Sequence, residues 1–259
     1  MIVRAVWVNL RVFLGGRRFL WLVGGLLVLW LFAYHLLNPW DILLNVTDKH
    51  SFVFVAVPLY SLLINGELRN VWQSTVAIRL GSSGVWWLCH VVTSGVVAFV
   101  TSVGLAVLTT LISLVTQQWS WQWGYHVRHS EPPGILTRAP WSIPWHWGID
   151  ALAYFAIGLW VIGVLLHALT LWWRSAWLAW GAVVGVGLAS EALGGTVAQP
   201  AVWWLPGIQF SFYYHWGPSG PIALAWTLVY AVVLLGMATA AGWFMANRDG
   251  WHSAHGEGL

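Results

Sequence analysis

Histidines are the side chains of this chain best suited to chemistry, since ten of them accompany only eight acidic residues. His90 and His167 fall toward one end of two long apolar runs, and His35 and His215 fall toward the opposite face. Paired histidines on neighbouring membrane helices can ligate a haem iron. The spacing forces no particular two of these four onto one cofactor, so a haem site remains an alternative and no cofactor is predicted for this chain.

A second group of possible metal ligands lies between two apolar runs. It comprises His126, His129, Glu131 and His146. Imidazole and carboxylate groups are common zinc ligands. A solvated loop anchored by its tryptophans is the alternative interpretation, and it is the one we adopt, so no metal site is predicted.

Two carboxylates, Asp150 and Glu191, stand close to the ends of apolar runs. A carboxylate inside a membrane is a functional candidate, whereas one at a helix end is commonly a solvated residue or a cap. We assign Asp150 to the second class. Both interpretations stay open for Glu191, because Gly194 and Gly195 follow it closely.

Hydrolase motifs are missing from the sequence. A phosphate-binding loop of the G-x-x-x-x-G-K-[ST] type needs a lysine, and the only lysine, Lys49, has no glycine loop before it. There is also no H-E-x-x-H or G-x-S-x-G motif. The chain is therefore predicted not to be an enzyme, and any ATP and magnesium used with it would bind to another polypeptide.

Composition indicates which elements must position these residues. Apolar residues make up 59% of the 259 and charged residues only 7%, against roughly 25% in soluble domains. The 24 tryptophans suit a bilayer, where an indole can be apolar at one end and hydrated at the other. The basic residues are scattered, so no nucleic-acid partner is expected. An all-α integral membrane protein is predicted.

Uncharged runs mark the predicted spans. They are Phe19–Leu37, Ser51–Asn65, Trp86–Val115, Ile149–Trp173, Ser175–Ser190 and Pro221–Met245. These predict about six transmembrane helices, with five or seven as alternatives. The third run would be about 45 Å long as a helix, against a hydrocarbon core of about 30 Å. We therefore expect it to begin along the interface, anchored by Trp86 and Trp87.

Residues 1–18 are too basic for a span. Apolar residues there recur at helical spacing, with Trp7 among them, and Arg4, Arg11 and Arg18 share the opposite face. This pattern predicts an amphipathic helix at the membrane interface, with Trp7 on its apolar side. A disordered basic leader is the alternative. The next run, Phe19–Leu37, is longer than the apolar core of a signal peptide, so no cleaved signal is expected.

Loop charges predict the orientation. If the N-terminus is inside, eight arginines are cytoplasmic and three basic residues are outside, which the positive-inside rule favours. Both termini of this multi-pass chain are then cytoplasmic. One transmembrane domain, 1–259, is expected, with Asn38–His50 as a short outer loop, residues 66–85 as a cytoplasmic segment and 116–148 as an outer loop holding six tryptophans.

The cytoplasmic segment has helical periodicity from about Glu67 to Leu80, and Gly81 and Gly84 then interrupt it. Two interpretations stand. It is either an amphipathic connector lying on the membrane or a coupling helix presented to a cytoplasmic partner. For the second, the partner-facing residues are Glu67, Arg69, Trp72 and Arg79.

Between the fifth and sixth runs, glycine and proline interrupt an apolar sequence. A re-entrant or interfacial outer segment is predicted over 193–216, because this stretch is too apolar for open water. Its candidate outer-gate residues are Glu191, Gly194, Gly195 and Pro200.

The chain resembles the permease subunits of type-2 ABC exporters, particularly the short six-span forms of Gram-positive bacteria. The resemblance covers most of the chain and rests on three features. These are the basic amphipathic N-terminal helix, the cytoplasmic helix in which Arg79-Leu80-Gly81-Ser82 precedes Trp86-Trp87, and the Gly/Pro-broken outer segment, with Asn247-Arg248-Asp249 after the last span. The Trp-rich loop is larger than is usual in that family.

The resemblance implies a half-transporter in a bacterial cytoplasmic membrane. Two permease subunits, identical or different, would pair in the lipid bilayer, and each would rest on a separate ATP-binding cassette subunit that carries ATP and magnesium. Closure of those subunits would act through the helix containing Trp72 and Arg79. The implied substrate is amphipathic: a lipid, a peptide or a hydrophobic drug. A haem-binding or haem-handling membrane protein is the alternative function.

Overall fold

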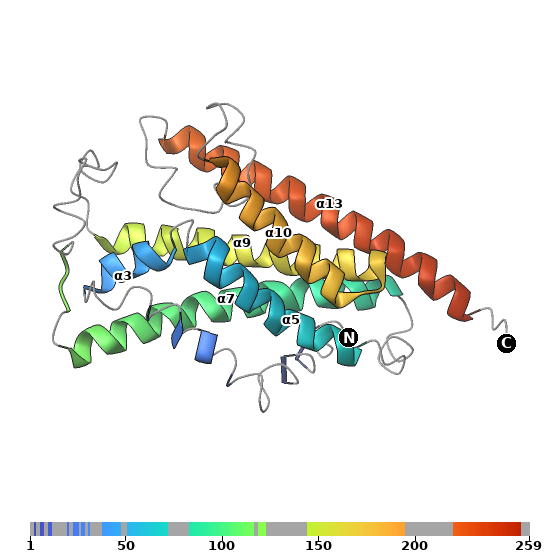
Figure 1. The fold of residues 1–259 in the computed structure, drawn as a ribbon, viewed down its shortest axis with the longest axis horizontal. Coiled ribbons are helices and arrows are strands. Elements are labelled where there is room, and N and C mark those ends of the chain that lie inside the picture. Colours follow the sequence, from blue (N-terminus) through green and yellow to red (C-terminus); the bar gives the residue numbers. More distant parts are fainter. Residues whose placement is uncertain are drawn as a thin grey trace.

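A computed structural model describes residues 38–47, 51–71, 83–116, 119–122, 144–194 and 220–254, together with 3, 6, 7, 10, 11, 20, 23–25, 27, 28 and 31. Side chains are described over most of these ranges. Within them every regular element is helical, in the order α3 (Pro39–Val46), η2 (Phe52–Ala56), α5 (Val57–Val71), α7 (Ser83–Val115), α9 (Pro144–Trp173), α10 (Ala176–Gly194) and α13 (Gly220–Ala254). Figure 1 shows them as one elongated bundle.

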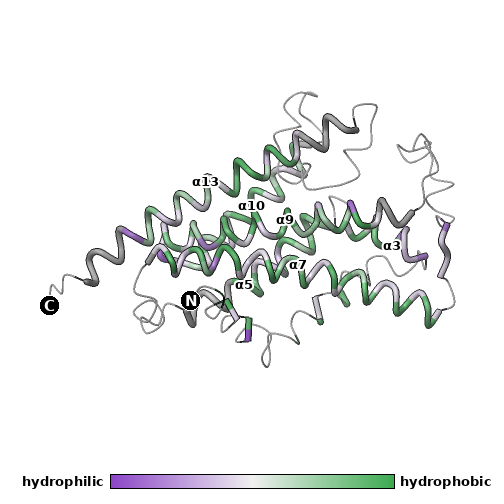
Figure 2. The backbone as a smooth tube through the Cα atoms, turned by 180° about the vertical axis from the view of Figure 1, so that it is seen from behind, coloured by the Kyte–Doolittle hydropathy of each residue, from purple (hydrophilic) through white to green (hydrophobic). Residues whose placement is uncertain are grey.

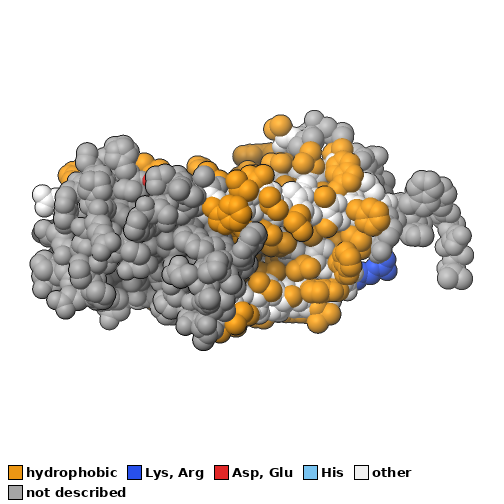
Figure 3. Space-filling model, turned by 90° about the horizontal axis from the view of Figure 1, so that it is seen from above, with side chains coloured by type: hydrophobic (Ala, Val, Ile, Leu, Met, Phe, Trp, Pro, Cys, Tyr) orange, Lys and Arg blue, Asp and Glu red, His pale blue; other side chains and the backbone are white. Residues whose placement is uncertain are grey.

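Three of these helices are long and apolar enough to cross a membrane. Their apolar parts are Gly84–Val115, Gly148–Trp173 and Trp226–Asn247. Two shorter apolar helices, Phe52–Ile64 and Ala176–Ser190, lie beside them. Hydrophobic residues run along most of the described backbone in Figure 2, and apolar side chains dominate the described surface in Figure 3. The chain is therefore a helical protein suited to a membrane, as its composition predicts.

Helix α9 occupies the centre of the bundle and packs against α7, α13, α10 and α5. Its fully buried side chains include Phe155, Leu159 and Leu166. The Phe155 ring meets that of Phe52 edge to face, with ring centroids 5.7 Å apart. Because α9 is apolar on all sides, it gives no amphipathic signal, which is typical of a helix surrounded by others.

The start of α7 corrects one expectation. Trp86 and Trp87 were predicted to anchor this helix start in the membrane interface, but both side chains are buried within the bundle, and Trp87 is 0% exposed. The Trp87 indole donates a hydrogen bond to the carbonyl of Thr239 on α13 at 2.9 Å. This packing is possible because α13 has Gly242 where the indole lies. The start of α7 is therefore held by close packing of Trp87 against α13 at Gly242, and not by contacts between tryptophan and lipid headgroups.

We expect Gly242→Ala to destabilise the bundle by about 1–3 kcal/mol, the usual cost of overpacking a filled core. An added methyl group would overlap the Trp87 indole. Gly236→Ala, on the same helix, is the matched control, since no described atom lies within 4 Å of its added carbon. The melting temperatures of the two variants in detergent provide the measurement. Equal melting temperatures would show that α7 and α13 do not pack in this way.

The predicted outer loop Asn38–His50 contains a short helix, α3. Asn38 caps it, because its Oδ1 accepts hydrogen bonds from the backbone N–H groups of Trp40 and Asp41 at 3.0 and 3.5 Å. Pro39 follows at the first helical position, where its missing N–H costs nothing. The Trp40 indole donates to the carbonyl of Ser120 at 2.7 Å. This helix therefore covers one end of α7 and α9.

Candidate functional site

The predicted coupling segment begins on α5. The sequence places the end of the second span at Asn65, but the helix continues through Gly66 to Val71. Glu67 and Arg69 therefore lie on the last turns of a helix that begins deep in the bundle. Trp72 and Arg79 lie outside the described residues, so their placement remains an expectation.

This end of α5 lies at the same end of the bundle as the turn between α9 and α10 and the end of α13 (Figure 1). The α9–α10 turn is tight. Arg174 adopts a left-handed conformation there, with φ 52°, and the Ser175 hydroxyl accepts a hydrogen bond from the N–H of Leu178 at 3.4 Å. Short connections of this kind hold neighbouring helices in fixed relative positions.

The N-terminal residues that are described are helical. Val6 is buried and Leu10 packs against the main core, whereas Trp7 is 58% exposed. The Arg11 guanidinium carbon lies 5.9 Å from the centroid of the Trp7 ring. Arg11 therefore shares a face with Trp7, one turn away, instead of lying opposite it as predicted. Arg4 and Arg18 lie outside the described residues.

At the other end of the bundle, α10 includes Glu191 and ends at Gly194. The predicted glycine break therefore coincides with the end of a helix, four residues beyond the predicted end of the span. Gly195, Pro200 and the rest of the predicted re-entrant segment lie outside the described residues. The outer-gate assignment remains a prediction.

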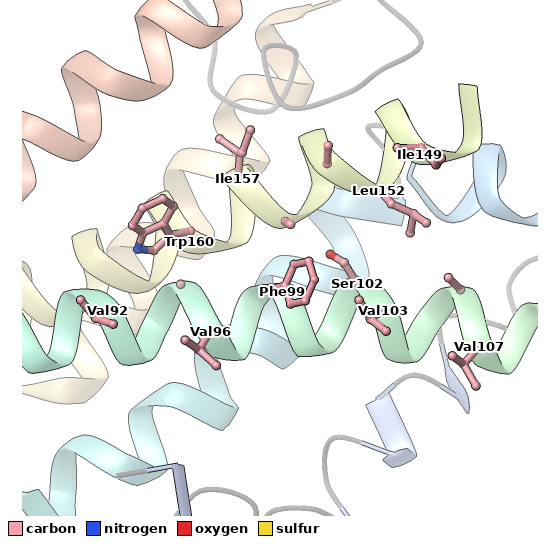
Figure 4. A pocket seen from close by; sticks show the side chains of 14 residues that line it. Val92, Val96, Phe99, Ser102, Val103, Val107, Ile149, Leu152, Ile157 and Trp160 are labelled. Atoms are coloured by element: carbon pink, nitrogen blue, oxygen red, sulfur yellow. The ribbon is translucent and has the colours of Figure 1, made fainter. Parts of the chain in front are cut away.

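An apolar groove of about 770 Å³ lies between α7 and α9. Figure 4 shows its walls, with Val96, Phe99 and Val103 on one helix and Ile149 and Trp160 on the other. Phe99 is 63% exposed and Ile149 is 56% exposed. The Ser102 hydroxyl is the main polar group in the lining, and it has no hydrogen-bond partner among the described residues. Such a groove suits an acyl chain or another amphipathic molecule.

Helix α10 presents an open face of small residues. Gly181 and Gly185 are exposed, and no described atom lies within 4 Å of a carbon added at either position. Ala189, four residues further on, is exposed as well. Small residues at every fourth position allow two membrane helices to approach closely. This α10 face is therefore available for a second helix.

Two buried histidines meet where α7 and α9 cross. His90 and His167 are 1% and 2% exposed, and their ring centroids are 5.1 Å apart with the planes tilted by 37°. The Trp86 ring meets His90 edge to face, with centroids 4.5 Å apart. Sequence spacing did not identify this pair. The available signal was that both residues lie near the same end of adjacent antiparallel spans.

The pair does not have the spacing of a bis-histidine haem. An imidazole nitrogen lies about 2 Å from a bound metal, so rings on opposite sides of one iron have centroids roughly 6 Å apart. The observed separation is shorter, 5.1 Å, and the two rings pack directly on each other. A porphyrin between them would have to separate the helices.

The described part of the chain was the only part in which a larger group of possible metal ligands could be sought. No group of three or more histidine, cysteine, aspartate or glutamate side chains is placed to hold a metal there. His126, His129 and Glu131 lie outside the described residues.

The chain matches no protein-family model, no curated protein and no solved structure. Its function is therefore inferred from its own residues.

Proposed function

We propose that this chain is the membrane-spanning permease subunit of an ATP-driven ABC exporter, with six spans and both termini in the bacterial cytoplasm. It moves an amphipathic substrate such as a lipid, a peptide or a hydrophobic drug. ATP is hydrolysed by a separate subunit. This proposal joins the resemblance of the sequence to type-2 permeases with the arrangement of helices in the described part of the chain.

The observation that carries the proposal is the continuity of α5. A connector that lies on the membrane from Gly66 onward would have to turn at Asn65, the predicted end of the second span. Instead, Val57–Val71 is one helix, and its polar end, with Glu67 and Arg69, extends from the core that contains Tyr60 and Ile64. Because the helix is continuous, a displacement of its polar end would also move the residues of α5 that pack in the bundle. This is what coupling to an ATP-binding subunit requires.

The substrate class is supported by the groove between α7 and α9. Its lining is apolar, with a single serine hydroxyl that is buried and unpaired within the described part of the chain. A wall with so few polar groups cannot orient a highly charged solute, because such a solute would lose its hydration without compensation. An acyl chain or an apolar side chain gives up no hydrogen bonds to water when it enters this groove.

Orientation has a direct test. In a variant with Cys89 replaced by serine, a cysteine at position 130 should react with an impermeant maleimide in intact cells, and a cysteine at position 82 should not. The expectation follows from the excess of arginine on the predicted inner loops. Permeabilised cells provide the control, in which both positions should react. Equal labelling of the two in intact cells would overturn the topology.

The proposed function predicts a complex. When the chain is expressed with a stand-alone ATP-binding subunit encoded beside it, the two should purify together in detergent at a fixed ratio. An unrelated ATP-binding subunit, expressed in the same way, is the control. A chain that purifies alone, with a haem absorption band, would instead establish the alternative function.

A further inference from the structure

Beyond the proposed transport function, the buried histidine pair of α7 and α9 remains unexplained. Both Nδ1 and Nε2 of His90, and Nε2 of His167, have no hydrogen-bond partner among the described residues. Leaving a buried polar atom without a partner is costly. The His90 ring packs instead on the rings of His167 and Trp86. The crossing is therefore closed tightly around two polar rings that it does not satisfy.

The contacts of His167 suit a neutral ring. Its Nδ1 lies 2.6 Å from the carbonyl oxygen of Gly163, which can only accept, so Nδ1 carries the proton. The Ser94 hydroxyl lies 3.5 Å from the same nitrogen. A second proton, on Nε2, would make the ring a cation, and no acceptor for that proton is present among the described residues. His90 has no acceptor there for a proton on either nitrogen.

The helices that carry the pair offer no counter-charge to it. On α7 the neighbouring thiol of Cys89 is buried and free, and on α5 the Tyr60 hydroxyl donates to the carbonyl of Ser94 at 3.0 Å. The carboxylate of α9, Asp150, is 17 residues from His167, which is about 25 Å along the helix. No described carboxylate joins the two histidines in a group of three.

The other helices packed here are equally apolar. Helix α10 has no ionisable side chain between Ala176 and Ser190. The α13 side chains that pack in this region are Ala238, Met245 and Ala246. A proton on either histidine would therefore be a buried and unpaired charge, which is strongly unfavourable while the crossing stays closed.

The pair adjoins one end of the groove between α7 and α9. The indole N–H of Trp160 donates to the carbonyl of Val91, the residue after His90, at 2.9 Å. A carbon added at Gly95 would lie 3.0 Å from the same indole, so Trp160 also packs closely on the backbone of α7. Figure 4 shows Trp160 in the groove wall, near Val92. This wall depends on the same approach of α7 to α9 that closes the histidine contact.

We propose that His90 and His167 form a pH-sensitive contact that controls the groove. When both rings are neutral they pack together, and Trp160 stays on α7. A proton on either ring separates the two helices at this end, withdraws Trp160 from α7 and opens the groove. Each histidine lies about 10 Å along its helix from the nearer end, at Ser83 or Trp173, so water reaches the pair once this end opens.

The direction of the pH dependence follows from proton binding. A histidine in water has a pKa of about 6.5. The open form, in which both rings are hydrated, therefore binds more protons below about pH 6.5 than the closed form, whose contacts suit neutral rings. Lowering the pH through this range favours the open form, and raising it restores the closed form. As regulation of substrate binding this inference rests on the proposed function, whereas the movement itself does not.

Cys89, the only cysteine of the chain, can report the opening, because its side chain is 1% exposed and it precedes His90. The test measures its reaction with dithiodipyridine in the full-length protein in nanodiscs, at pH 8 and at pH 5. The rate in unfolded protein at the same pH corrects for the chemistry of the thiol. Relative to that rate, the reaction should be roughly tenfold faster or more at pH 5, since one proton changes the equilibrium up to tenfold per pH unit. The helix content should not change.

Replacing His90 with phenylalanine and His167 with glutamine removes both titrating rings. Cys89 should then be equally protected at both pH values, whereas His215→Gln, at a histidine elsewhere in the chain, should behave as the wild type. Equal protection of Cys89 at pH 8 and pH 5 in the wild type would overturn the movement, whether or not the double variant folds. A double variant that opens at pH 5 as the wild type does would overturn the role of the pair.

The groove has a readout of its own. A neutral long-chain alcohol that carries a photoreactive diazirine should label α7 and α9 at pH 8 and label them roughly tenfold less at pH 5, because the open groove loses its Trp160 wall. The double variant should be labelled equally at both pH values. Exposure of Cys89 without this change in labelling would overturn control of the groove. Neither measurement includes the ATP-binding subunit, so its failure is distinguishable from failure of the proposed function.

Discussion

If the chain is the permease that we propose, replacing Trp72 with alanine and Arg79 with glutamate should leave it folded and inserted but separate it from the ATP-binding subunit. If the segment that continues α5 is a coupling helix, its tip fits a groove on that subunit. Tryptophan and arginine most often dominate such interfaces when they are desolvated. Losing one anchor typically costs about 2 kcal/mol, which is roughly thirtyfold in affinity. Losing both should abolish co-purification and substrate-stimulated ATP hydrolysis.

A membrane-lying connector would behave differently. Arg79→Glu would then disturb headgroup contacts worth about 1 kcal/mol without touching a protein partner. Arg4→Glu on the N-terminal helix is the matched control, because it makes the same charge change at a residue predicted to face lipid headgroups. Expression and monodispersity should match the wild type in all variants. Unchanged co-purification and turnover in the double variant would rule out the coupling helix.

If two copies of the proposed permease pair through α10, replacing Gly181 and Gly185 with leucine should convert the dimer into monomers. Both glycines are open in the single chain, and no described atom lies within 4 Å of a first side-chain carbon added at either position. The leucine side chains would, however, prevent a second α10 helix from approaching as closely as small residues allow. We expect the dimer to be weakened at least tenfold, which is about 1.4 kcal/mol or more.

Mass measurement in detergent, or cross-linking in membranes, gives the oligomeric state. Gly236→Leu is the matched control, since it adds the same bulk at another open glycine on α13. That variant should remain dimeric, and all three proteins should have similar melting temperatures. A double variant that still forms dimers would show that the subunits do not pair through the α10 face.

Much of the fold could be predicted because apolar length determines where a membrane helix can lie. The third and fourth runs end at Val115 and Trp173, where α7 and α9 end, since polar residues follow each of them. The start of α3 was missed although Asn38 and Pro39 carry a cap signal. Its shortness made the stretch resemble a loop.

Contacts between helices could not be predicted from one sequence. The helical period places His90 and His167 on helices, but the rotation and offset of α7 against α9 decide whether they meet. The burial of Trp87 depends in the same way on Gly242, which lies 155 positions away in the chain. Composition assigned the tryptophans to the interface, and the close packing of α7 on α13 buried this one instead.

We propose that this chain couples the hydrolysis of ATP on another polypeptide to movement in the membrane. The most direct measurement is the rate of ATP hydrolysis by the ATP-binding subunit in nanodiscs, alone and together with the chain. We expect the chain to raise this rate and amphipathic compounds to change it further, and we expect Trp72→Ala with Arg79→Glu to return it to the value of the subunit alone. A rate that is the same with and without the chain would contradict it.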